Sequence, residues 1–292
     1  MSEAVSVSSN SGRANPRNLC IDDDKFIPGY CQLMDVLHPY GCAFFVELYH
    51  PGRQGDSALN GGRRMFAPSA IQCGLTHQPV IAMTNEEIAC MVQKFINGAI
   101  RCQKAGVDGV LIHAAHGYLI SEFLSPLTNK RDDAYGGSLE NRCRLLEEIL
   151  AAVRQAWPET KPLLVRVSAE DYLEGGIHPA DMVQIVKRIK PWADMIDVST
   201  GGVAQAPIRV YPGYQVKAAE QIRTECSIPT IAVGLIKDPQ MVEEILGNGR
   251  ADMVGLGREQ FRKPNWVLNT ARDYGIDYPW PDSYLEAFEA RK

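Results

Sequence analysis

The feature that most constrains the fold is a series of short apolar runs that alternate with longer helical patterns from residue 41 onward. Each run is apolar almost throughout, which is typical of parallel strands buried on both faces. The order strand, helix, strand, helix therefore predicts a parallel sheet with helical crossovers. The predicted strands are residues 43–48, 110–113, 163–167, 195–198, 230–233 and 253–256.

Helical stretches between these strands carry recognisable end signals. Thr84 is the expected N-cap of the first, with Glu87 in the capping-box position and Gly106 as the terminator. Ser138 is expected to cap the second, and Pro179 lies in the first turn of the third. The four predicted helical stretches are residues 84–106, 138–157, 178–190 and 238–249.

This alternation predicts a (β/α)8 TIM barrel rather than a dinucleotide-binding doubly wound sheet, because no GxGxxG motif follows a strand. The count is short of eight, with six strand–helix units and a strand remnant at residues 4–7. Residues 8–40 are predicted to form a loop and one crossover helix. We therefore expect an N-terminally truncated barrel of about six and a half βα units, forming a single domain over residues 1–292.

Composition excludes several classes of partner. The net charge is −5 and no basic stripe is present, so no nucleic-acid partner is expected. The eight cysteines are scattered without a Cys-x-x-Cys pair, which is typical of the reducing cytosol. No apolar run is long enough to span a membrane, and residues 1–18 lack the regions of a signal peptide. A cytoplasmic protein without a membrane partner is predicted.

Polar residues gather where the predicted strands end, which is the end of a barrel that carries the chemistry. Glycines and an arginine after the last two strands favour a phosphate site, in which backbone N–H groups and a cation hold the anion. Histidines and a tyrosine follow the second strand of the series, which indicates an elongated, phosphate-bearing cofactor between the two groups. The strand-end residues are Glu47, His50, Arg53, His113, His116, Tyr118, Arg166, Gly234, Gly257 and Arg258.

The thirty residues "HAAHGYLISEFLSPLTNKRDDAYGGSLENR", 113–142, resemble the signature of the Old Yellow Enzyme family of FMN-dependent ene reductases. The resemblance continues in order through "RVSAEDYLEGG", "IDVSTGGV", "YPGYQV", "ADMVGLGRE" and "PWPDSYLEAF". It covers nearly the whole chain and is greatest to the bacterial single-domain NADPH dehydrogenase branch.

The resemblance implies roles for the residues at matching positions. His113 and His116 would bind the carbonyl oxygen of an α,β-unsaturated substrate, since two donors polarise the C=C bond as an oxyanion site does. Tyr118 would be the general acid that protonates the α-carbon. Arg166 would stabilise negative charge on the flavin. The resemblance also places Glu47 beside the flavin ring, and it assigns the FMN phosphate to Gly234, Gly257 and Arg258.

The family further implies FMN as the cofactor, NADPH or NADH as the hydride donor, and a small enone-type substrate. The two-domain members hold an iron–sulfur cluster through cysteines beyond the barrel, but here the last cysteine is Cys226. No iron–sulfur cluster is therefore expected, and no metal site is predicted. Because family members self-associate, a homo-oligomer is compatible with the resemblance.

Two departures from the family leave a second hypothesis open. Glu47 stands where the family has glutamine, and a carboxylate accepts hydrogen bonds but cannot donate one. Family members also begin with about one and a half more βα units. The alternative to an ene reductase is thus a non-catalytic barrel remnant or gene fragment that binds little or no FMN.

Ordinary structural roles compete with each functional assignment. His50, His113 and His116 offer a zinc site, although a fourth ligand is not obvious and Arg166 stays unexplained. Arg166 alone would suit an ion pair with Glu170 or Asp171, and isolated glycines are more often turn residues than phosphate ligands. A Schiff-base role for Lys161 is disfavoured because this lysine precedes its strand.

Overall fold

The computed structural model describes residues 1–277 and 282–283. The family motif at residues 279–288 therefore lies outside the described residues, apart from Asp282 and Ser283. In the described part of the chain, no helix is both long enough and apolar enough to cross a membrane.

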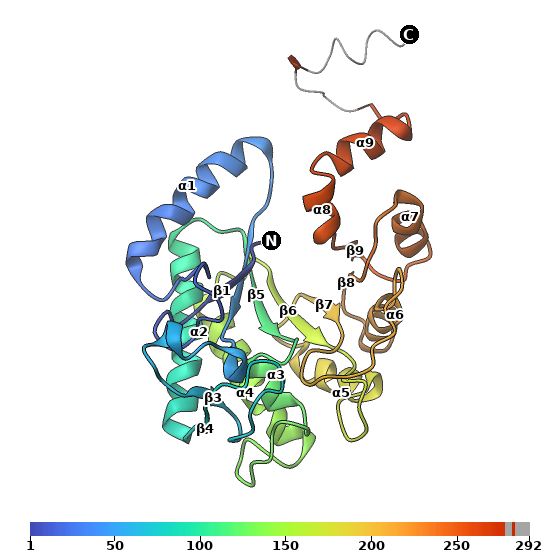
Figure 1. Ribbon diagram of the computed structural model, residues 1–292. Helices are drawn as coiled ribbons and strands as arrows, with labels where there is room; N and C mark the ends of the chain where they lie inside the picture. Colours follow the sequence, from blue (N-terminus) through green and yellow to red (C-terminus); the bar gives the residue numbers. More distant parts are fainter. Residues whose placement is uncertain (278–281, 284–292) are drawn as a thin grey trace.

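A single sheet of seven parallel strands forms the centre of the molecule (Figure 1). The strands follow one another in chain order, which is the topology of consecutive βα units in a barrel wall. The predicted α/β class is confirmed, and the strand predicted at residues 4–7 exists. The seven strands are β1 (Ala4–Ser6), β2 (Phe45–Tyr49), β5 (Gly109–Ala114), β6 (Leu163–Ser168), β7 (Met195–Ser199), β8 (Thr230–Ala232) and β9 (Met253–Val254).

Helices pack along the outside of this sheet (Figure 1). The capping box at Thr84 and Glu87 is present, Ser138 accepts from the amide of Asn141, and Pro179 opens its helix, so the predicted helix starts are confirmed. The helices are α1 (Ile27–Leu37), α2 (Asn85–Lys104), α3 (Leu119–Leu124), α4 (Leu139–Ala156), α5 (Pro179–Ile189), α6 (Val216–Cys226), α7 (Pro239–Gly247), α8 (Arg258–Arg262) and α9 (Trp266–Asp273).

The connection between β2 and α2 is more structured than the sequence predicts. It contains a second, two-stranded parallel sheet, together with short 3-10 helices. Each strand of this sheet has only three residues, so no alternating pattern marks it. These elements are β3 (Met65–Ala67), β4 (Val80–Ala82), η3 (Gly52–Gln54) and η4 (Ala58–Asn60); two further 3-10 helices, η1 (Asp24–Phe26) and η2 (His38–Tyr40), flank α1.

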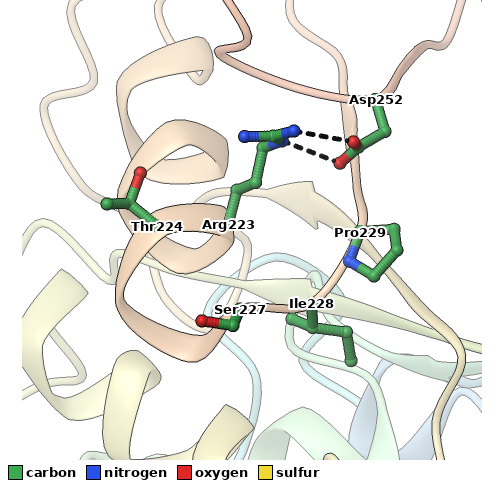
Figure 2. Close-up of a pocket in the computed structure, with 6 residues that line it drawn as sticks. All are labelled: Arg223, Thr224, Ser227, Ile228, Pro229 and Asp252. Atoms are coloured by element: carbon green, nitrogen blue, oxygen red, sulfur yellow. Dashed lines mark hydrogen bonds and ion pairs between the residues drawn. The ribbon is translucent and has the colours of Figure 1, made fainter.

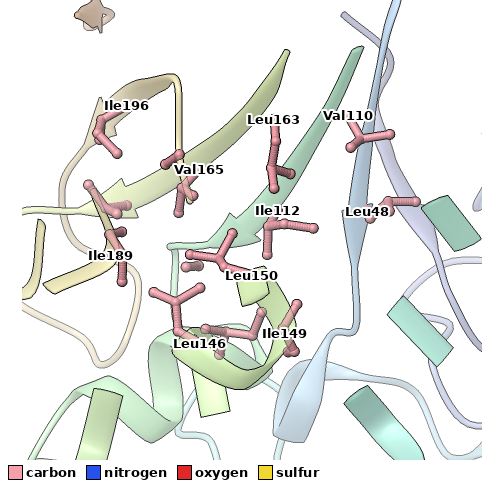
Figure 3. Packing of buried hydrophobic residues seen from close by; sticks show 14 of the residues in the cluster. Leu48, Val110, Ile112, Leu146, Ile149, Leu150, Leu163, Val165, Ile189 and Ile196 are labelled. Carbon is pink, nitrogen blue, oxygen red and sulfur yellow. The ribbon is translucent and has the colours of Figure 1, made fainter. Parts of the chain in front are cut away.

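The apolar core has two parts, one on each face of the sheet. The larger part lies between strands and helices, where residues such as Val110, Ile112 and Val165 pack against α4 (Figure 3). The smaller part lies on the inner face and contains Leu111 and Leu164. Because successive strand side chains point to opposite faces, residues two positions beyond this inner layer also face inward.

Candidate active site

A row of polar side chains crosses the inner face of the sheet near the carboxyl ends of the strands. Parallel pairing sets His113 of β5 directly opposite Arg166 of β6, and Arg166 opposite Asp197 of β7. His113 and Arg166 lie two residues beyond members of the inner apolar layer, and Asp197 lies two residues beyond Met195, which packs against that layer. All three side chains therefore project inward. The sheet register alone thus brings together residues that are far apart in the sequence.

Arg166 is held between two buried carboxylates. Its Nη1 lies 3.3 Å from Oε1 of Glu47, and its Nε lies 3.3 Å from Oδ2 of Asp197. Both carboxylate side chains are only 5% exposed, whereas that of Arg166 is 24% exposed. Glu170 and Asp171, the ion-pair partners considered from the sequence, are not the residues that hold this guanidinium.

The charges in this cluster shift one another's proton affinities. Burial raises the pKa of Asp197 to about 6, although the Arg166 guanidinium opposes the shift. Burial likewise raises the pKa of Glu47, again against the attraction of Arg166. Burial alone would lower the pKa of Arg166, but Asp197 and Glu47 outweigh it and the net shift is upward. Arg166 therefore stays charged, and its two partners are the groups that titrate.

Asp197 is a site residue that the sequence analysis missed. It lies inside the run "MIDV", residues 195–198, which the sequence predicts to be a buried strand and which belongs to β7. The sequence signal that could have identified Asp197 is a charged residue within an otherwise apolar strand, which is the same signal that identifies Arg166. Among the described residues, Asp197 Oδ1 and Arg166 Nε are buried without a hydrogen-bond partner. Buried polar atoms without a partner indicate that a polar group of a ligand can bind at the inner face.

His113 and His116 form a hydrogen-bonded pair. His113 Nδ1 accepts from the amide of Ala115 at 3.3 Å, so Nε2 carries the proton and points to Nδ1 of His116 at 3.1 Å. The Nε2 of His116 is then the donor to Ser199 Oγ at 2.7 Å. Burial, followed by the charge of Arg166, lowers the pKa of His113 to about 3. Burial and His113 lower the pKa of His116 as well, so both rings are neutral at neutral pH.

Tyr118 completes the group around His113. The two ring centroids are 4.9 Å apart, and the ring of Tyr49 lies 5.2 Å from that of Tyr118 on another side. Burial and then the charge of Glu47 raise the pKa of the Tyr118 phenol. The phenol therefore keeps its proton at neutral pH and can act as a proton donor.

The side chains of His50 and Arg53 are held by contacts outside this group. His50 is buried, contacts Ser11 at 3.4 Å through Nε2 and accepts from the Gly52 amide at 3.2 Å through Nδ1. Burial lowers its pKa to about 3. Because both ring nitrogens have protein partners, His50 does not join His113 and His116 as a zinc ligand. Within the described residues, no group of three or more His, Cys, Asp or Glu side chains is placed to hold a metal ion.

Arg53 has a structural environment instead. It is buried against Glu122, with the two charged groups 3.5 Å apart, and it also donates to the carbonyl of Val203. Burial raises the pKa of Glu122 well above its usual range, in opposition to Arg53. The ion pair ties the segment after β2 to α3, and the hydrogen bond to Val203 ties it to the loop after β7.

Gly234, Gly257 and Arg258 follow the paired strands β8 and β9 at their carboxyl ends. Gly234 has a φ of +119°, a conformation that favours glycine, and a Cβ there would approach Gln215 Oε1 at 3.0 Å. Around Gly257, by contrast, no atom of the described residues other than its chain neighbours lies within 4 Å of the place a Cβ would occupy. Exposed Arg258 comes directly after it at the start of α8. These features fit a phosphate group, although Gly234 itself is already packed by Gln215.

The opposite end of the sheet carries a different surface. A hollow of about 420 Å³ lies beside the start of β8 and β9, where Arg223 donates twice to Asp252 at 3.0 Å (Figure 2). Lys161 is also at this end, with its Nζ donating to the carbonyl of Val107 at 2.6 Å. Both features lie at the amino ends of strands, away from the histidines, so neither belongs to the candidate site.

Comparison with known proteins gives a consistent result. Residues 1–274 match the model of the NADH:flavin oxidoreductase / NADH oxidase family. The chain is 48% identical to an NADPH dehydrogenase of Clostridium acetobutylicum over 287 residues, which cover 98% of this chain and 84% of that protein. It is 46% identical to an NADPH dehydrogenase of Halalkalibacterium halodurans, with 98% and 82% covered.

Solved structures agree with these sequence matches. An old yellow enzyme homologue from Zymomonas mobilis superposes with a TM-score of 0.79 at 26% identity, covering 95% of this chain and 79% of that one. A 2-naphthoyl-CoA reductase superposes with a TM-score of 0.85 at 26% identity, covering 93% of this chain and 44% of that one.

Proposed function

The chain belongs to the NADH:flavin oxidoreductase / NADH oxidase family and is an NAD(P)H-dependent flavin oxidoreductase; from this premise we propose that it reduces the C=C bond of α,β-unsaturated carbonyl compounds with FMN as its flavin. The observation that carries the proposal is the contact of His113, His116 and Tyr118 beside the inward-facing Arg166. Two neutral donors, a proton-bearing phenol and a fixed cation are the groups that such a reduction requires.

The donor set on the inner face fits a flavin. Arg166 would lie against the flavin edge that gains negative charge, with Glu47 beside it, while the phosphate would be held by Gly257 and Arg258 with Gly234 nearby. The chemistry that FMN would supply in this site is hydride transfer from NAD(P)H to the β-carbon of the substrate. The cation on Arg166 favours the flavin state that carries more negative charge, and the two carboxylates keep that cation in place.

The histidine pair would bind the carbonyl oxygen of the substrate. Because their lowered pKa values keep both rings neutral, each ring has one N–H and adds no charge to the site. To bind a carbonyl oxygen, His113 would turn its N–H away from His116, and His116 would turn its N–H away from Ser199. A neutral imidazole can polarise a carbonyl, as in other enzymes that stabilise an enolate. Ser199 holds the outer nitrogen of His116 and so orients the ring.

Tyr118 would supply the proton that completes the reduction. Its raised pKa keeps the phenol protonated at neutral and mildly alkaline pH, and its contact with the ring of His113 supports this role. The proton would go to the α-carbon, next to the carbon that receives the hydride. The alternative of a non-catalytic barrel remnant is not favoured, because the relatives match 98% of the chain.

The test is anaerobic turnover of 2-cyclohexenone with NADPH. The proposal expects one molecule of cyclohexanone for each NADPH consumed, measured by gas chromatography and absorbance. Cyclohexene is the matched control, because it has the same ring and C=C bond but no carbonyl for the histidines to bind. NADPH oxidation without cyclohexanone, or equal reduction of both compounds, would contradict the proposed role of the histidine pair.

A further inference from the structure

We propose that Gln54 is a positioning residue that holds the turn carrying His116 in place, an inference that rests on the proposed function of that histidine. Gln54 ends the 3-10 helix η3 and is half-buried. Nothing in the sequence pattern singles it out. Its importance follows from the three carbonyl groups that surround its side-chain amide.

The Gln54 amide nitrogen joins the two loops that flank the site. Its Nε2 lies 2.8 Å from the carbonyl oxygens of both His116 and Gly117, which follow β5. It lies 3.1 Å from the carbonyl oxygen of Gly202, which follows β7. A carboxamide nitrogen carries two hydrogens, so one N–H serves two of these three acceptors. A single side chain thus satisfies the carbonyl groups of two segments that are far apart in the sequence.

The backbone at this point needs such a donor. His116 has a φ of +58°, which is uncommon for a residue with a side chain, and Gly117 and Gly202 have φ values of +70° and +100°. The two segments are packed so closely that a Cβ on Gly202 would lie 2.5 Å from the Cα of His116. Three carbonyl oxygens that converge on one place repel one another unless a donor lies between them. Gln54 supplies that donor.

Ser168 makes a second link between the same two segments. Ser168 Oγ accepts from the amide of His116 at 2.9 Å and donates to the carbonyl of Gly201 at 2.8 Å. Gln54 and Ser168 therefore tie the His116 turn to the Gly201–Gly202 segment at two places. The ring of His116 contacts Ser199 and His113, and its direction also depends on the backbone that Gln54 and Ser168 fix.

Gln54 is itself anchored by its neighbour. The amide of Arg53 donates to Oε1 of buried Glu122 at 3.0 Å, and the Arg53 guanidinium reaches the carbonyl of Val203, next to Gly202. The segment that carries Gln54 is thereby bonded both to α3 and to the loop after β7. An amide on an already ordered segment loses little conformational freedom when it bonds the three carbonyls.

The test compares Gln54→Met with wild type. Methionine has a similar length but no N–H, so the turn is expected to relax and His116 to lose its direction. Flavin-loaded protein is reduced anaerobically and mixed either with 2-cyclohexenone or with ferricyanide, which takes electrons without a carbonyl donor. We expect oxidation by cyclohexenone to slow by about 10- to 100-fold, as for a small misplacement of a catalytic group. Oxidation by ferricyanide should be unchanged.

Two further variants and one spectroscopic measurement complete the design. Gln78→Met is the matched control, because Gln78 lies in the same connection and its side chain accepts from the Ser57 amide, which is remote from the His116 turn; it should behave as wild type. Gln54→Lys restores an N–H donor and should recover part of the rate with cyclohexenone. NMR of histidine labelled with 15N, assigned with His116→Gln, should show a shift of the His116 ring signals in Gln54→Met, with or without flavin.

Each outcome decides between explanations. Wild-type rates with cyclohexenone and unchanged His116 signals in Gln54→Met would overturn the inference. An equal loss with cyclohexenone and ferricyanide would also overturn it, because the defect would then be one of the whole flavin site. If wild type itself fails to react with cyclohexenone, the proposed function fails, and the His116 signals alone then decide whether Gln54 positions the turn.

Discussion

Replacing Asp197 by asparagine is expected to stabilise the folded protein above pH 6, even though the change removes an ion pair. Asp197 is 3% exposed, and among the described residues its one ion-pair partner, Arg166, is shared with Glu47. Burial outweighs the attraction of Arg166, so the pKa rises from 3.8 to about 6. The folded protein therefore prefers the neutral carboxyl group, which asparagine imitates in shape.

The size and sign of the effect follow from this shift. One pKa unit corresponds to about 1.4 kcal/mol, so the rise from 3.8 to about 6 corresponds to about 3 kcal/mol. Between these two values the folded state binds more protons than the unfolded state, and the free energy of unfolding falls as pH increases. Asp197→Asn cannot ionise. Its gain over wild type should be near zero below pH 4 and reach about 3 kcal/mol above pH 6.

The assay is urea unfolding of the flavin-free protein between pH 4 and 8, followed by circular dichroism. Asp108→Asn is the control with the opposite sign. Although burial acts to raise the pKa of Asp108, hydrogen bonds from the Phe44 amide and His38 lower it overall. Its stabilising effect is lost as pH falls, so this variant should be less stable than wild type at pH 8. An Asp197→Asn protein that is less stable than wild type at pH 8 would refute the reasoning.

Two further predictions concern the chemistry. Tyr118→Phe should slow cyclohexenone reduction by about 100-fold, because the proton donor is lost, while NADPH still reduces the flavin at the wild-type rate; stopped-flow absorbance separates the two steps, and equal slowing would count against a proton-donor role. Glu47→Gln should raise the flavin reduction potential by about 30 mV, equivalent to about 1.4 kcal/mol, since a buried negative charge beside Arg166 is removed; an unchanged potential in a dye-linked titration would contradict this.

Much of the fold could be predicted because its signals are local. The strands were recognisable as apolar runs, and the helix starts as caps such as Thr84 and Ser138, whose partners lie three residues away. The inward and outward faces of the strands could not be separated in the same way. Leu111 faces the interior and Ile112 the helices, yet both positions are apolar because each faces a core.

The candidate site could be predicted only where residues resembled a known motif. His113, His116 and Tyr118 lie within six residues of one another, and the structure brings them together with Arg166 and Glu47. Their catalytic roles stay predictions. Asp197 and Gln54 were missed because their partners are distant in the chain and are set by sheet register and loop packing. No local pattern contains that information.

The most direct test of the account is the visible spectrum of the purified chain after it has been mixed with excess FMN and desalted. We expect a retained flavin band that NADPH bleaches under anaerobic conditions and that 2-cyclohexenone restores. A folded sample that retains no flavin, or whose bleached band does not return with cyclohexenone, would contradict the assignment of this site to FMN-dependent reduction of enones.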